Sequence, residues 1–192
     1  MASRRRWPKV VVALVFLVAV GTFEWLIWNP RVDIPAHADA ILVPAYRADR
    51  QELARELAAQ GISDNIVVSR SKRVQRLQDP NDRLTMADDE WFEECDKEYP
   101  HYRAFCIVPQ PNSTLGEVTA FVKLAAEQGW ESVLIVTERS HLGRVEMIMR
   151  RCFTGRVYGA ASKPKGGFSR NVYRSFYELG AYVKDSVAGS CR

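Results

Sequence analysis

The chain has 192 residues, of which 47% are apolar and 26% charged, so it holds one domain of ordinary size with at most a short appendage. This composition excludes a disordered or collagen-like chain. The formal net charge of +4 is unevenly placed: residues 1–30 carry four bases and one acid, whereas residues 31–192 carry 23 bases and 22 acids. Because the body of the chain is almost neutral, we expect no nucleic-acid partner.

The N-terminal segment has the length and pattern of a membrane-spanning helix. Residues 1–6 contain a basic cluster, Arg4 to Arg6, and a mostly apolar run follows from Trp7 to Trp28. These 22 residues would form about 33 Å of helix, which matches a hydrocarbon core of about 30 Å. The positive-inside rule then predicts a cytoplasmic basic head at residues 1–6, an anchor over residues 7–28, and an extracytoplasmic location from Asn29 onward.

A cleaved signal peptide is the alternative, since it would share the basic and apolar regions. The small-x-small site Ala36-His37-Ala38 lies eight residues beyond Trp28, and cleavage there would leave a chain that starts at Asp39, almost inside the first predicted strand. A buried core helix is a further alternative. We expect an uncleaved anchor, so the membrane is the first predicted partner.

A proline-containing linker over residues 29–38 is expected to lift the domain, residues 39–192, off the membrane. Within the domain, short apolar runs alternate with segments of helical periodicity. The expected strands are residues 39–43, 65–69, 105–108, 132–137 and 156–160. The expected helices are residues 49–60, 114–128, 140–152 and 171–187. This alternation predicts an α/β fold with a mainly parallel sheet that helices cover on both faces.

Residues 70–103 interrupt this alternation. The region contains Pro80, Pro100 and the acidic stretch Asp88-Asp89-Glu90, and its middle, residues 83–97, is expected to form a helix. We interpret it as a crossover helix with a solvated charged face, and an acidic recognition patch is the alternative.

Four cysteines lie in the predicted outer domain: Cys95, Cys106, Cys152 and Cys191. An even number on the oxidising side of a membrane favours disulfides. Three connectivities are possible, of which we expect Cys95 with Cys106 and Cys152 with Cys191; free buried thiols are the alternative. The cysteines show no Cys-x-x-Cys spacing, and the three histidines form no ligand pattern with them, so no metal site is expected.

Polar side chains follow the ends of the predicted strands, where open parallel sheets bind ligands and helix N-termini point. The candidates for holding an anion are Arg47, Arg50, Ser69, Ser113, Thr114, Thr137 and Arg144. Guanidinium groups and helix-terminal amides suit phosphate or carboxylate oxygens. No phosphate-binding loop, Gly-x-Gly-x-x-Gly fingerprint or Gly-x-Ser-x-Gly elbow is present, and no cofactor is expected.

His141 and Glu117 are the candidate catalytic residues, with His141 as acid or base and Glu117 as its neighbour. Each also has a structural interpretation. Glu117 would complete a capping box with Thr114 at the start of its own helix, and His141 would be a hydrogen-bonded structural histidine.

These positions form an ordered series of blocks. The blocks are Asp39 to Val43; Arg50, Ala54, Leu57 and Gly61; Ile66 to Ser69; Ser113, Thr114 and Glu117; and Val136, Thr137, His141 and Arg144. The series resembles the pattern of the YdcF/SanA/ElyC-like family of bacterial proteins, and the resemblance runs from about Asp39 to about Ala160. It departs from the family at Pro44-Ala45-Tyr46, in place of a glycine-rich turn, and at Arg70, in place of a glycine.

The resemblance implies a Rossmann-like three-layer sandwich behind a single N-terminal anchor, an association with the cell envelope and its barrier function, and one pocket lined by the motif residues. We therefore expect a membrane-anchored protein that binds an anionic, phosphate-bearing envelope intermediate. One alternative is a non-catalytic envelope factor whose segment from Asp88 to Tyr102 engages a protein partner. A weaker alternative is a nucleotide or S-adenosylmethionine binder.

Overall fold

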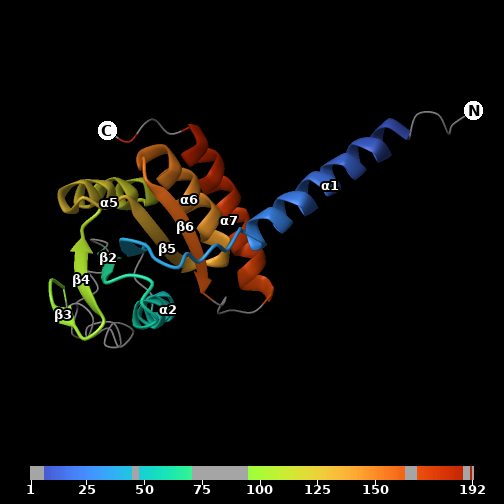
Figure 1. Cartoon of the computed structure of the whole chain (residues 1–192). Helices are drawn as coiled ribbons and strands as arrows, with labels where there is room; N and C mark the ends of the chain where they lie inside the picture. The colour runs from blue at the N-terminus through green and yellow to red at the C-terminus, as the bar shows by residue number, and fades with distance from the viewer. Residues whose placement is uncertain (1–6, 45–47, 71–94, 163–167, 188–190, 192) are drawn as a thin grey trace, which may run out of the picture.

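The computed structural model describes residues 7–44, 48–70, 95–162, 168–187 and 191. Helix α1 (Trp7–Trp28) leads away from an α/β domain that contains the rest of the described chain (Figure 1). The apolar side chains of α1 are exposed along most of its length, and the helix is long and apolar enough to cross a membrane. A core helix of a soluble domain would instead be buried, so this alternative is excluded for residues 7–25.

The domain is built on a six-stranded sheet in the order β3-β4-β2-β1-β5-β6. Its parallel strands are β1 (Ala40–Val43), β2 (Asn65–Ser69), β4 (Tyr102–Ile107), β5 (Ser132–Glu138) and β6 (Arg156–Ser162). Strand β3 (Glu98–Tyr99) pairs with β4 in the antiparallel sense. The central strands are continuous apolar runs because both of their faces are buried, as is usual in parallel sheets.

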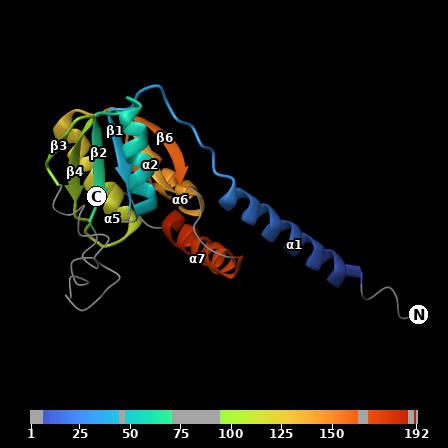
Figure 2. The ribbon, with the colours of Figure 1, turned by 90° about the horizontal axis from the view of Figure 1, so that it is seen from below.

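Helices cover both faces of this sheet (Figures 1 and 2). Helix α2 (Ala48–Ala59) packs on one face, over side chains that include Ile41 and Val68. Helices α5 (Thr114–Gln128) and α6 (Arg139–Cys152) pack on the other face, over Leu42 and Val67. Helix α7 (Phe168–Val187) packs against α6 and the end of α1. The α/β sandwich expected from the sequence is therefore confirmed.

The described part of residues 70–103 differs from the expected helix over residues 83–97. Cys95 and Asp96 form a turn, and Asp96 has a left-handed backbone with φ 63°. The amide of Asp96 donates to Ala104 O at 2.8 Å, and that of Ala104 donates to Lys97 O at 3.0 Å. The prediction of a helix is therefore wrong for residues 95–97, because this segment leads into β3, which pairs with β4 as a hairpin. Residues 71–94 lie outside the described ranges.

Both disulfides join the cysteines that were expected to pair. Cys95–Cys106 ties the turn before β3 to strand β4, with Cα atoms 5.5 Å apart. Cys152–Cys191 ties the segment after α7 to the end of α6, with Cα atoms 5.4 Å apart. The second bridge spans 39 residues and, by loop-closure entropy, stabilises the fold by about 4 kcal/mol.

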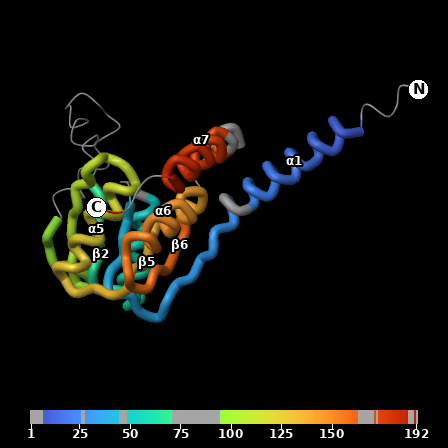
Figure 3. Tube along the Cα trace, turned by 90° about the horizontal axis from the view of Figure 1, so that it is seen from above, coloured from blue at the N-terminus to red at the C-terminus, as the bar shows by residue number. Residues whose placement is uncertain are grey.

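The linker over residues 29–38 is attached to the domain by backbone hydrogen bonds. Asp33 and Gly159 form an antiparallel bridge, in which the amide of Asp33 donates to Gly159 O at 2.9 Å and that of Gly159 donates to Asp33 O at 3.2 Å. The amide of Ala38 donates to Ile62 O at 2.8 Å. Figure 3 shows the linker running beside β6, the edge strand, whose open backbone groups it satisfies in part. The domain is therefore held close to the end of α1.

Candidate functional site

The carboxyl ends of β2 and β5 and the first turns of α5 and α6 bring several predicted residues together on one face of the sheet. Thr137 is the second-to-last residue of β5 and lies on the side of Ile135, which faces α5 and α6. Ser69 ends β2 on the same side as Val67. Thr114, His141 and Arg144 reach this region from the starts of the two helices. All five side chains are buried.

His141 lies between two hydroxyl groups. Its Nδ1 is 3.2 Å from Thr137 Oγ1, and its Nε2 is 3.4 Å from Thr114 Oγ1. Burial, and then the neighbouring guanidinium groups of Arg144 and Arg50, lower the pKa of His141 well below 6.5. The imidazole is therefore neutral at pH 7, with one nitrogen donating and the other accepting.

Arg144 is held by two carboxylates of α7. Its Nε and Nη2 donate to the two carboxylate oxygens of Glu178, at 2.7 and 3.3 Å, and its Nη1 donates to Asp185 Oδ2 at 2.9 Å. Nη1 also donates to Thr114 Oγ1 at 2.8 Å. Burial lowers the pKa of Arg144, but the hydrogen bonds and charges of Glu178 and Asp185 outweigh it and raise the pKa above the ordinary value of an arginine. The guanidinium predicted to bind a ligand thus binds carboxylates of the chain itself.

Sequence reasoning missed Glu178 and Asp185. The available signal was their spacing of seven residues, two helical turns, which puts both acids on one face of the predicted final helix. Nothing in the sequence paired them with an arginine more than thirty residues earlier.

Arg50 lies on the opposite face of the sheet from Thr137. Its Nη1 donates to Pro44 O at 2.7 Å, and its Nη2 is 3.4 Å from Glu138 Oε1. Glu138 also pairs with Arg174 of α7. Because successive side chains of a strand point to opposite faces, Thr137 turns toward α6 and Glu138 toward α2. Thr137 and Arg50 therefore approach from different faces of the sheet, although the charge of Arg50 still acts on His141.

The other predicted residues occupy different positions. Ser113 caps α5, and its Oγ accepts the amide of Gly116 at 3.2 Å. Ser69 is fully buried, and its hydroxyl has no hydrogen-bond partner among the described residues. Glu117 is buried one turn along α5 from Thr114, whereas the hydrogen bonds of His141 within the described residues go to the two threonines. Arg47 lies outside the described residues.

A pocket of about 470 Å³ opens between the start of α5 and α7, in front of Thr114 and Arg144. Its polar lining residues are Asn112, Ser113, Thr114, Arg144, Lys184 and Asp185. Its apolar lining residues are Phe176, Tyr177, Gly180 and Ala181. The volume is that of a small-molecule site. The pocket combines an exposed lysine, the N-terminal end of a 15-residue helix and two aromatic rings.

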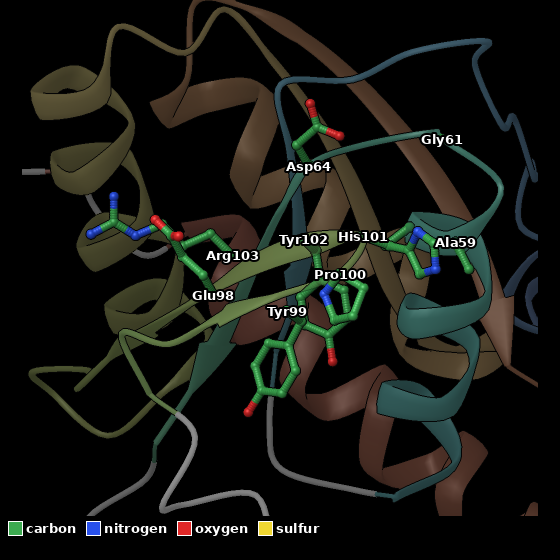
Figure 4. A pocket seen from close by; sticks show the side chains of 10 residues that line it. Ala59, Gly61, Asp64, Glu98, Tyr99, Pro100, His101, Tyr102 and Arg103 are labelled. Carbon is green, nitrogen blue, oxygen red and sulfur yellow. The ribbon is translucent and has the colours of Figure 1, made fainter.

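A second pocket, of about 410 Å³, lies at the opposite end of the strands (Figure 4). It is lined by the β3–β4 hairpin and by the end of α2, and it contains none of the predicted site residues. The rings of Tyr99 and Tyr102 stack there with centroids 4.8 Å apart. Within the described ranges, His, Cys, Asp and Glu side chains do not gather in any group that could hold a metal ion.

Comparisons of the chain with models of protein families, with curated proteins and with solved structures find no match. Fold and site together define the class of this protein: a parallel α/β domain, stapled by two disulfides, behind one helix that could cross a membrane. Because one fold serves many functions, function resides in the pocket and the residues around it.

Proposed function

We propose that α1 anchors this protein in a cell membrane with its domain outside the cytoplasm. We further propose that the pocket in front of Thr114 and Arg144 binds an anionic, phosphate-bearing intermediate of the cell envelope. The observation that carries the proposal is the meeting of Lys184, the α5 N-terminus and two aromatic side chains in one pocket.

Three features support the anchor and its orientation. Helix α1 is exposed and apolar over a full bilayer thickness. The basic residues Arg4 to Arg6 precede it, which favours a cytoplasmic N-terminus. The two disulfides in the domain are typical of an oxidising compartment.

The pocket has the donors that an anion needs. Helix α5 directs the positive end of its dipole and its first backbone amides toward the pocket, and Ser113 and Thr114 line that end. Lys184 brings an exposed positive charge to the same opening. Arg144 is already paired with Glu178 and Asp185, whose two negative charges exceed its single positive charge, so its main task is to hold the Thr114 hydroxyl in place.

The resemblance to the YdcF/SanA/ElyC-like family supports a role in envelope biogenesis or barrier function. Thr114 from one block of the family pattern and Thr137, His141 and Arg144 from another form one hydrogen-bonded cluster. His141 does not line the pocket, and an acid or base must be within reach of the proton it transfers. The geometry therefore supports binding more strongly than acid–base catalysis.

The proposal is tested by purifying the full-length chain from cell membranes and identifying co-purifying molecules by mass spectrometry. The test variant is Lys184→Gln, and the control is Lys123→Gln, which removes an exposed lysine of α5 that is not part of the pocket lining. We expect a phosphate-bearing molecule with the wild type and the control, and roughly a tenfold loss with Lys184→Gln, the effect of one charge-assisted hydrogen bond. The proposal would be rejected if the wild type and both variants retained the molecule equally, or if the wild type retained no phosphate-bearing molecule.

A second candidate function is a protein contact through the β3–β4 hairpin. The stacked Tyr99 and Tyr102 and the concave surface of Figure 4 favour it, since aromatic side chains are enriched at protein interfaces. Under this alternative, His101→Ala at the exposed hairpin would abolish binding of the protein partner, and Lys184→Gln would leave that binding intact.

A further inference from the structure

We infer that α7 is a second membrane contact: its exposed apolar face lies on the surface of the bilayer that α1 crosses, on the domain side. This face consists of Tyr173, Phe176, Tyr177, Val183 and Val187, and we call it the aromatic face of α7. The inference rests on the proposed anchor and deepens the proposed function, because the same face borders the pocket.

Helix α7 has the reverse of the usual pattern of a surface helix. Ser175, Glu178 and Asp185 point into the protein and are at most 8% exposed. The side chains of the aromatic face, which lie along one side of the helix, are between 56% and 82% exposed. A soluble domain normally buries the apolar stripe of a helix and exposes the polar one. A contiguous exposed apolar stripe indicates a contact outside the folded domain.

The position of α7 identifies the bilayer as that contact. The indole Nε1 of Trp28, the last residue of α1, donates to Ser175 Oγ at 2.8 Å, and Arg139 Nη1 donates to Trp28 O at 3.4 Å. These bonds hold α7 at the level where α1 leaves the hydrocarbon core. Figure 1 shows α7 running across the domain end of α1, and Figure 2 shows it on the side of the domain from which α1 departs. A helix in that place lies along the membrane surface.

The chemistry of the face fits an interfacial helix. Tyrosine rings prefer the boundary between headgroups and hydrocarbon, and phenylalanine and valine insert just below it. Three exposed cations, Arg31, Arg139 and Lys184, come from the linker after α1, the start of α6 and α7 itself. At headgroup level they complement lipid phosphates. The tether through α1 keeps the bilayer adjacent to the face at all times, an advantage that a partner in solution lacks.

The consequence concerns how a ligand reaches the pocket. Phe176 and Tyr177 belong both to the aromatic face and to the pocket lining. With α7 on the bilayer, the pocket opens at the membrane surface. The class of ligand is therefore an amphiphile that enters sideways, with its phosphate beside Thr114 and Lys184 and its apolar chain still in the lipid.

The inference is tested with the full-length chain at one copy per lipid nanodisc, made of phosphatidylcholine with phosphatidylglycerol. A cysteine is introduced by Tyr173→Cys or Tyr177→Cys and labelled with a nitrobenzoxadiazole fluorophore; Lys123→Cys, on the exposed side of α5, is the aqueous control, and Val12→Cys reports on the anchor. We expect both α7 labels to be quenched by spin-labelled lipids and to react with aqueous dithionite at least about fivefold more slowly than the control, as for an interfacial helix. Val183→Asp, at an exposed position, should return the Tyr177 label toward the control rate.

Labels on α7 that behave like the Lys123 label, while the Val12 label is lipid-protected, would overturn the inference. Protection that requires two copies per disc would also overturn it, because the occupant would then be a second chain. The two proposals can fail separately. If the α7 labels are in water but the protein still retains the phosphate-bearing molecule, only this inference is wrong. If the α7 labels are protected by lipid but the protein retains no such molecule, only the proposed ligand is wrong.

Discussion

Arg144 Nη1 donates a hydrogen bond of 2.8 Å to Thr114 Oγ1, and this bond joins the first turn of α5 to the second turn of α6. The same guanidinium holds Glu178 and Asp185, so three helices meet at one buried cation. The floor of the pocket thus depends on an ion-pair network, and variants of this network affect stability and binding together.

Replacing Arg144 with Ala should lower the free energy of unfolding by about 3–5 kcal/mol, because two buried carboxylates lose their counter-charge. Adding Glu178→Gln to Arg144→Ala should recover part of this loss, since one uncompensated charge is removed. The measurement is urea unfolding of the solubilised chain followed by fluorescence, with Lys123→Ala as the control. A loss below about 1 kcal/mol, the range of exposed ion pairs, would show that the network contributes little.

His141 should make the fold sensitive to mild acid. Burial and two nearby cations lower its folded pKa, so below pH 6.5 the unfolded chain takes up a proton that the folded chain does not. Stability should therefore fall as the pH decreases from 7.5 to 5.5, by at most about 1.4 kcal/mol per pH unit from this group. His141→Gln should have a flatter profile, whereas His101→Gln, at an exposed position, should follow the wild type.

Asp39 should stabilise the start of the sheet. Its Oδ2 accepts hydrogen bonds from the amides of Glu131 and Ser132, at 2.8 and 2.7 Å, and from Ser132 Oγ at 2.7 Å. Burial raises the pKa of Asp39, but these bonds outweigh it and lower the pKa below 3.8. We expect Asp39→Asn to cost about 2 kcal/mol at pH 7, a typical value for hydrogen bonds to a charged group.

The Asp39 contribution is present above pH 3.8 and is lost as the pH falls through the folded pKa, so the difference between wild type and Asp39→Asn should shrink toward pH 2. Unfolding curves across this range give the measurement. Asp64→Asn, at an exposed position, is the matched control, and equal effects of the two substitutions would contradict the assignment.

Gly116→Ala should disturb the start of α5. A Cβ at this position would lie 1.9 Å from the backbone oxygen of Pro111, so the loop before Ser113 would have to move. We expect a destabilisation of about 1–3 kcal/mol, as for an overpacked site, together with weaker retention of the pocket ligand. Gly143→Ala on α6 is the control: its Cβ meets open space, and it should be neutral or stabilising by up to about 1 kcal/mol. Equal unfolding temperatures for the two variants would refute the steric explanation.

The strands were predictable because each reads as a short apolar run, and Ile41, Val67 and Leu134 are buried as such runs require. The hairpin at Glu98–Tyr99 was missed because a two-residue strand has no periodicity to detect. The attachment of Asp33 to Gly159 was missed for a different reason. It depends on an edge strand 126 residues later, and local sequence does not encode such a pairing.

The residues of the candidate site were predictable one by one, since His141, Thr137 and Thr114 follow strand ends or begin helices. Their division between the two faces of the sheet was not foreseen. Thr137 and Glu138 are neighbours in the chain, yet one contacts His141 and the other Arg50. Successive side chains of a strand point to opposite faces, which predicts this separation. The prediction requires, however, that the ends of β5 be known to within one residue.

By itself, the sequence determined the class of fold and the candidate membrane helix, because hydrophobic periodicity is a local property. It left three disulfide connectivities open, and the tertiary structure selected one of them. Only the tertiary structure decided the partners of Arg144 and the orientation of α7. A helix with one polar and one apolar face can pack against the protein through either of these two faces. Here the buried guanidinium selects the polar face, since an unpaired charge inside a protein costs far more than exposed apolar surface, and the aromatic face is left outward.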